Sequence, residues 1–328
     1  MSKQILYVGV DVGASALWAS LPGLRARQFG HTGAGIRQLH RWAVKHSGGA
    51  VVHLCMEATG VYSQQVAVRL VDQPRTEVSI VNPACIKSFA NAQLRRSKTD
   101  ALDAEVIRCY AETQAPPAWH PAPKALRQLH ALVAQADALE DDLHQWRNRQ
   151  HAHGYTEDLP RAVKASQRAI ERSLEKEVTK VEAAIDQLCA ADPDLAQQVL
   201  LLETIPGIAR KSAVRLLAYG QNWLTDRSPK ELVAYAGLAP HHHQSGTSVR
   251  GRSRIDKRGN RHLRKTLYMP ALVGSVHNPI LSEFYQRLCA NGKLKKVALV
   301  ACMRKLLLMA RSMLINKTTF NPNYQPLT

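Results

Sequence analysis

Four acidic residues in the first third of the chain have the residue type and spacing of a metal-binding cluster. Asp11 and Glu57 each follow a short apolar run that predicts a buried strand. Asp100 and Asp103 stand three residues apart at the start of a predicted helix, so both carboxylates lie on one face. Acids at strand ends of an α/β sheet point into the crevice where ligands bind. Four carboxylates in one place stay ionised together only with cations between them, so the set predicts Mg²⁺ or Mn²⁺ acting on a phosphodiester.

Taken singly, each of these acids also has a structural explanation. Asp11 and Glu57 could be turn residues, Asp100 a helix cap, and Asp103 a first-turn acid. Their position at strand ends favours a functional set, and so does the adjacent basic run of residues 95–98. We expect this run to contact nucleic acid through Arg95, Arg96 and Lys98.

A second group of reactive residues lies in a polar, glycine-bearing loop over residues 244–261. Ser245 precedes Gly246, so its hydroxyl could approach a phosphate without steric hindrance. Serine is a poor nucleophile unless a neighbour activates it, so the residues alone favour a phosphate-binding loop in which Ser245 and Ser248 only hydrogen-bond to DNA. The basic side chains expected to neutralise the phosphate are Arg250, Arg252, Arg254, Lys257, Arg258 and Arg261.

The elements that must position the four acids are those of an α/β domain, which we expect over residues 1–122. Apolar runs predict strands at 4–11, 17–20, 25–30, 50–56 and 78–81. Helical spacing predicts helices at 36–45, 61–70 and about 99–112. A proline-stiffened linker follows at 115–123.

The rest of the chain has the pattern of helices. Residues 126–188, interrupted at 154–160, predict an antiparallel helical hairpin or coiled coil, with dimerisation as its role and a domain over 123–192. A mainly α domain is expected over 193–328, with helices at 263–276 and 293–314. Its I-P-G-I run at 205–208 is similar to a helix-hairpin-helix turn, with a plain helical hairpin as an equal alternative. Three consecutive histidines at 241–243 cannot all face one ion, so we expect surface or phosphate contacts.

Composition limits the classes of protein that fit. Lysine and arginine total 44 against 26 acids, a formal net charge of +18, which favours a polyanionic partner. Six dispersed cysteines without a C-x-x-C pair exclude a zinc ribbon and favour reduced thiols. The chain has no cleavage-site pattern and no run of about 20 apolar residues, so we expect a cytoplasmic protein without a membrane partner.

Motifs along nearly the whole chain resemble, in order, those of the DEDD transposases of the insertion-sequence one-ten family, relatives of the Piv-type DNA invertases. The first four are Y-V-G-V-D at 7–11, E-A-T-G at 57–60, V-N-P-A at 81–84 and S-K-T-D-A-L-D-A at 97–104. The others are I-P-G-I at 205–208, A-Y-A-G-L-A-P at 234–240, S-G-T-S-V-R-G at 245–251 and L-R-K-T-L-Y-M-P-A at 263–271.

The resemblance implies more than the residues alone do. It implies a RuvC-like, ribonuclease-H-like fold with Asp11, Glu57, Asp100 and Asp103 as metal ligands, a dimerising coiled coil, and a C-terminal transposase domain. Ser245 would attack DNA to give a phosphoserine intermediate, which reverses the expectation from chemistry alone. The resemblance also implies a structured guide RNA, the bridge RNA, pairing with target and donor DNA. It further implies a dimer or tetramer with sites shared between subunits, and a bacterial, nucleoid-associated location.

Three other functions were compared with this one. The run at residues 9–15 is similar to the first phosphate loop of actin-like sugar kinases, but the second glycine-rich loop of that fold is missing from the sequence. A RuvC-like junction endonuclease that uses metal-activated water fits the acids without the serine. A non-enzymatic nucleic-acid-binding protein fits the charge alone. The basic charge fits each of the nucleic-acid functions, so it does not distinguish them.

Overall fold

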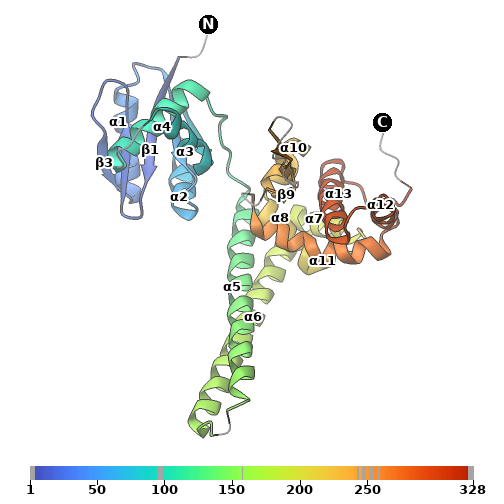
Figure 1. Ribbon diagram of the computed structural model, residues 1–328. Coiled ribbons are helices and arrows are strands. Elements are labelled where there is room, and N and C mark those ends of the chain that lie inside the picture. Colours follow the sequence, from blue (N-terminus) through green and yellow to red (C-terminus); the bar gives the residue numbers. More distant parts are fainter. Residues whose placement is uncertain are drawn as a thin grey trace. The chain divides into compact units, whose positions relative to one another are not determined.

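A five-stranded mixed sheet forms the centre of the first part of the chain (Figure 1). The computed structural model describes residues 4–94, 99–156, 158–241, 244–245, 249–250, 254–256 and 259–323. These form two compact units, Met1–Pro121 and Ala122–Thr328. The expected division into three domains at residues 122 and 192 stays a prediction.

The sheet has the strand order β3-β2-β1-β4-β5. Its strands are β1 (Ile5–Val12), β2 (Ala16–Ser20), β3 (Arg27–Gly30), β4 (Val51–Glu57) and β5 (Thr76–Val81). β2 runs antiparallel to both β1 and β3, whereas β1, β4 and β5 are parallel. The three parallel strands therefore bring their carboxyl ends to one edge of the sheet, and two of the predicted acids stand there.

Helices cover both faces of this sheet. Val8, Val10 and Val12 of β1 pack with α1 (Gly33–Lys45) and α2 (Val61–Leu70) in one core. Cys55 of β4 packs on the opposite face with α3 (Pro83–Ala92) and α4 (Asp100–Gln114). Because side chains alternate along a strand, every second residue of β1 and β4 faces α4. The predicted mixed α/β fold of this part is confirmed.

A buried hydroxyl holds the segment that leaves this unit. Ser79 in β5 donates to the carbonyl of Pro117 at 2.7 Å, and its Oγ lies 2.6 Å from Nε2 of His53. Both side chains are almost fully buried, at 1% and 3% exposed. The proline-stiffened linker expected at 115–123 is therefore tied to the sheet edge by a specific polar contact.

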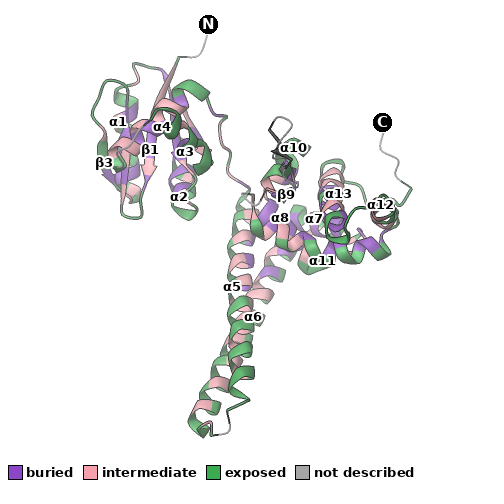
Figure 2. Ribbon diagram, viewed as in Figure 1, coloured by how far each residue is buried: buried purple, intermediate pink, exposed green. Residues whose placement is uncertain are grey.

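The second unit begins with two long helices that run antiparallel, α5 (Lys124–His153) and α6 (Arg161–Ala191). The Trp146 indole donates to the Gln167 carbonyl at 3.0 Å, and Arg147 pairs with Glu171 at 2.9 Å. Figure 2 shows that the far part of this pair is mostly exposed, whereas its base is buried. The pair is an antiparallel hairpin, as predicted. Coiled-coil packing and a role in dimerisation stay predictions.

The remaining helices share one core with the base of this hairpin. They are α7 (Pro193–Glu203), α8 (Arg210–Gly220), α9 (Trp223–Asp226), α10 (Pro229–Tyr235), α11 (Arg261–His277), α12 (Pro279–Ala290) and α13 (Lys295–Asn316). In the turn between α7 and α8, a Cβ on Gly207 would lie 2.6 Å from the Pro270 carbonyl of α11. This turn packs into protein, which favours the plain helical hairpin. In the described residues, no helix has the length and apolar character needed to span a membrane.

The sequence analysis gave no separate helix at the positions of α3, α9, α10 and α12. Of these, α3 and α12 each begin at an Asn-Pro pair. The Asn82 side chain accepts from the Ala84 amide at 2.9 Å, and the Asn278 side chain accepts from the Ile280 amide at 3.1 Å. Proline fits the next position because the first helical residue needs no backbone donor. In both places the pair starts a helix.

Candidate functional site

Strand register places Asp11 and Glu57 side by side at the carboxyl edge of the sheet. Val10 of β1 is paired with Met56 of the parallel strand β4, so Asp11 and Glu57 are the next residues along their strands. Glu57 lies two residues after Cys55, whose side chain packs against α4. The alternation of side chains therefore turns both carboxylates toward the α4 face.

A glycine lets the helix that carries the other two acids approach this point. A Cβ on Gly9 would lie 2.1 Å from the Ala104 carbonyl and 2.3 Å from the Arg108 amide, so the backbone of α4 rests directly on β1. Gly9 and Asp11 are two residues apart and share a face of the sheet. Asp103 immediately precedes Ala104, and Asp100 lies at the start of the same helix. Sequence analysis did not assign Gly9 a role, although an isolated glycine inside a strand signals close backbone approach.

The start of α4 is fixed by Thr99, whose side chain accepts from the Leu102 amide at 3.3 Å. Thr99, not Asp100, is the cap, so the structural explanation for Asp100 does not apply. Both aspartates lie in the first turn, where the helix dipole favours negative charge. Asp100 is exposed and Asp103 is half-buried, so solvent reaches this end of the helix.

Electrostatics show that the four acids share one environment. The pKa of Asp11 is raised from 3.8 to about 6, first by burial and then by the charges of Asp103, Asp100 and Glu57. The Val12 amide opposes this rise. The other three acids therefore lie near enough to Asp11 for their charges to raise its pKa. Within the described residues, no group of three or more His, Cys, Asp or Glu side chains is arranged to hold a metal ion. The donor set nevertheless suits a hard cation, because it consists of carboxylate oxygens on an accessible edge.

Ser245 lies in a small β-ribbon. It belongs to β7 (Gln244–Ser245), which pairs antiparallel with β8 (Val249–Arg250), so that Ser245 faces Val249 in the register. A second antiparallel pair, β6 (Pro240–His241) with β9 (Arg254–Ile255), flanks the first pair in the sequence. The environment of the Ser245 side chain lies outside the described residues, and its role stays a prediction.

The two ends of the segment that carries these strand pairs are held close together, and we call this point the base of the ribbon. A Cβ on Gly259 would lie 2.3 Å from the Gly237 amide nitrogen, so the two chain segments touch backbone to backbone. Asn260 caps α11 and also donates to the Tyr235 hydroxyl at 2.9 Å. Gly237 has a φ of 67°, which an L side chain rarely adopts. The serine-bearing segment therefore leaves and re-enters the helical unit at one fixed point.

A polar cluster next to this base was missed by the sequence analysis. The Tyr219 hydroxyl donates to Asp137 at 2.7 Å, and Arg215 pairs with the same carboxylate. Burial and this hydrogen bond raise the pKa of Tyr219. The Tyr219 ring stacks on His262 of α11 at 4.9 Å. These contacts join α5, α8 and α11 beneath the ribbon. Arg215 and Tyr219 are one turn apart in the sequence, but their partner is 78 or more residues away.

Only some of the cations predicted to bind nucleic acid lie among the described residues. Arg261 is the first residue of α11, is exposed, and its Nε lies 3.2 Å from Nε2 of His262. Arg250 and Arg254 lie in β8 and β9, but their side chains fall outside the described residues. The other predicted contacts lie wholly outside them: Arg95, Arg96, Lys98, Arg252, Lys257 and Arg258.

Comparisons with known proteins cover nearly the whole chain. Residues 199–286 match the family described as Transposase IS116/IS110/IS902 family, and residues 8–153 match a second family, described as Transposase, of the DEDD and IS110 type. The chain is 33% identical to the pilin gene-inverting protein of Moraxella bovis, over 98% of this chain and 98% of that protein. The homologue from Moraxella lacunata gives the same values. An IS110 protein of Streptomyces coelicolor is 30% identical over 43% of this chain and 33% of its own length.

Proposed function

Because this chain belongs to the IS110 family of transposases and DNA-inverting proteins, we propose that it cuts and rejoins DNA strands through its four carboxylates and the Ser245 hydroxyl. The observation that supports the proposal is that Asp103, Asp100 and Glu57 lie near enough to Asp11 for their charges to raise its pKa. The mixed sheet, with β2 antiparallel beside three parallel strands, supports a RuvC-like fold for the first unit.

The four carboxylates have the chemistry to hold divalent cations, with Mg²⁺ or Mn²⁺ preferred by an all-oxygen set. Such cations, when bound, stabilise the charge on attacking and leaving oxygens of a phosphodiester. Asp11 and Glu57 would hold them from the strand ends, while Asp100 and Asp103 would hold them from the first turn of α4. The half-buried position of Asp11 favours charge neutralisation, because its carboxylate is partly removed from water.

The proposed step at Ser245 is a transesterification. Its hydroxyl loses a proton and forms a bond from Oγ to phosphorus, and the bond from phosphorus to one deoxyribose oxygen breaks. That oxygen takes up a proton and leaves as a strand end. The hydroxyl of an incoming strand then attacks the phosphoserine, restores a phosphodiester and returns the serine. The arginines of the cationic loop would neutralise the phosphate during both steps.

We extend the proposal, on family resemblance, to a structured guide RNA and to an oligomer in which one subunit's carboxylates act with another's serine. The net charge of +18 supports binding to both kinds of nucleic acid. Sequencing the RNA that copurifies with the protein tests the guide. We expect one structured species encoded beside the gene, and only degraded cellular RNA would contradict it.

The chemistry is tested by isolating the protein from bacteria that carry its own flanking DNA, under denaturing conditions, and mapping nucleotide adducts by mass spectrometry. We expect an adduct on Ser245 that disappears in Ser245→Ala and persists in the control Ser248→Ala. Strand cleavage should fall by about 10³-fold or more in Ser245→Ala. Cleavage that continues unchanged in this variant would favour the hydrolytic endonuclease. Full activity in Asp11→Asn would favour a protein that only binds nucleic acid.

A further inference from the structure

The sheet face opposite α4 is covered by helices from a nearly acid-free stretch of the chain. Between residues 12 and 71 the only acid is Glu57, which belongs to the carboxylate group. The same stretch carries six cationic residues: Arg25, Arg27, Arg37, Arg41, Lys45 and Arg69. All six are exposed, and all lie outside the set of cations expected from the sequence to bind nucleic acid. We call this set the α1–α2 basic face.

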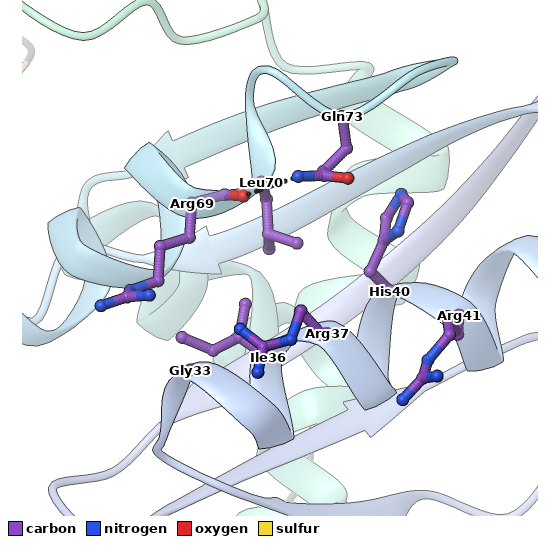
Figure 3. Close-up of a pocket in the computed structure, with 8 residues that line it drawn as sticks. All are labelled: Gly33, Ile36, Arg37, His40, Arg41, Arg69, Leu70 and Gln73. Atoms are coloured by element: carbon purple, nitrogen blue, oxygen red, sulfur yellow. Dashed lines mark hydrogen bonds between the residues drawn. The ribbon is translucent and has the colours of Figure 1, made fainter.

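Two hollows run along this face. The first has a volume of about 430 Å³ and is lined from α1 by Arg37 and Arg41 and from α2 by Arg69 (Figure 3). The second, of about 480 Å³, is lined by Arg25, Arg27 and again Arg41. Arg41 borders both, so the two hollows are neighbours on this face. Two neighbouring basic hollows can accept more than one phosphate, which suits an extended polyanion better than a single small anion.

Like charges are held close together in the first hollow. A Cβ on Gly33 would lie 3.1 Å from Nη1 of Arg69 and 3.6 Å from Nη1 of Arg37, so both guanidinium groups crowd one point. In the part of the chain that the structure describes, no carboxylate forms an ion pair with any of the six cations. Guanidinium groups gathered in this way repel one another, and a phosphate between them removes the repulsion.

The sheet separates these hollows from the carboxylates. Val10 and Val12 point into the core beneath α1 and α2, whereas Asp11 between them points toward α4. A phosphate on Arg37 and a phosphate beside Asp11 therefore lie on opposite faces of one unit.

We propose that the α1–α2 basic face binds the phosphodiester backbone of a nucleic-acid segment separate from the strand at the carboxylates. Arginine forks recognise phosphate oxygens in pairs, and such contacts position a backbone without reading its sequence. This surface goes beyond the proposed strand exchange and does not depend on the serine chemistry. The bound segment is duplex DNA outside the reacting site, because the transposase family description and the gene-inverting relatives point to DNA as the substrate. This choice of ligand rests on the proposed action on DNA.

The test removes three charges on this face and, as a control, three elsewhere. The variant Arg37→Gln/Arg41→Gln/Arg69→Gln is compared with Lys164→Gln/Arg168→Gln/Arg172→Gln, which changes three exposed cations at one-turn spacing on α6. Binding to a short random-sequence duplex DNA and to a hairpin RNA is measured by fluorescence anisotropy over a range of salt concentrations. EDTA is present throughout, so that metal-dependent binding at the carboxylates does not contribute.

We expect the first variant to bind the DNA probe about tenfold or more weakly than the control. The slope of log K against log salt should fall by about 2–3, close to one for each phosphate that is no longer neutralised. Weaker binding to the DNA probe supports the proposal. Weaker binding to the RNA probe alone contradicts it and identifies RNA as the ligand. The charge-preserving variant Arg37→Lys/Arg41→Lys/Arg69→Lys should recover most of the slope, which separates charge from folding. Affinity and slope equal to the control for both probes overturn the proposal, whatever the outcome at Ser245.

Discussion

Replacement of Asp11 by asparagine is expected to stabilise the first unit at pH 8 when divalent cations are absent. The folded state holds the pKa of this carboxyl at about 6 instead of 3.8. An acid with a raised folded-state pKa costs stability above that pKa and regains it as pH falls toward the unfolded value. The full difference corresponds to about 3 kcal/mol. Asp11 is only half-buried, so solvent screening reduces the expected gain in the variant to about 1–2 kcal/mol.

Hydrogen exchange in the intact chain measures this effect where it arises. Peptides from β1 and β4, followed by mass spectrometry, report the opening free energy of the first unit. Wild type and Asp11→Asn are compared at the same pH, first at 8 and then at 4.5, where the cost to the wild type has fallen to about one third. The exposed Asp72→Asn provides a matched control with the same chemical change. An Asp11→Asn variant no more stable than wild type at pH 8 would refute the inference that the acids crowd one another.

Three further substitutions test how the sites are positioned. Gly9→Ala should lower the unfolding free energy by about 1–3 kcal/mol in denaturant titration and abolish strand cleavage, because it forces α4 off β1. Gly30→Ala is the control, since its Cβ would meet only a side-chain oxygen at 3.8 Å, and equal effects of the two would contradict this explanation. Ser79→Ala should lower the unfolding free energy by about 1–3 kcal/mol in the same titration, because it removes the hydrogen bond to the Pro117 carbonyl. It should also speed proteolysis after residue 115, and unchanged proteolysis would show that this hydrogen bond does not hold the segment. Gly237→Ala should reduce DNA cleavage by distorting the ribbon base, as measured in a plasmid assay, and wild-type cleavage would show that the clamp is dispensable.

Local patterns predicted much of the fold. The strand at 4–11 and the helix at 61–70 were found from apolar periodicity, because each buries one continuous face. The helices α3 and α12, which begin at Asn-Pro pairs, were not predicted, although the asparagine of each pair supplies the cap. Both Asn-Pro pairs are visible in the sequence, but they were not used to predict the start of a helix.

The candidate site, like the fold, was predicted only in part from the sequence. The acids at strand ends could be grouped from the sequence, since parallel strands finish at one edge. That Asp100 and Asp103 reach this edge depends on a close approach at Gly9 that no local pattern specifies. The importance of Ser245 came from family resemblance alone, because nothing near it in the sequence activates a hydroxyl. The α1–α2 basic face went unnoticed since arginines spaced one turn apart are typical of a solvated helix face.

The central claim is that the four carboxylates act together on divalent cations, and counting bound Mn²⁺ by electron paramagnetic resonance tests it most directly. The wild-type protein and the Asp72→Asn control should each bind the metal at the same stoichiometry, whereas Asp11→Asn and Asp103→Asn should each lose that binding. Wild-type stoichiometry and affinity in both of these variants would contradict the account.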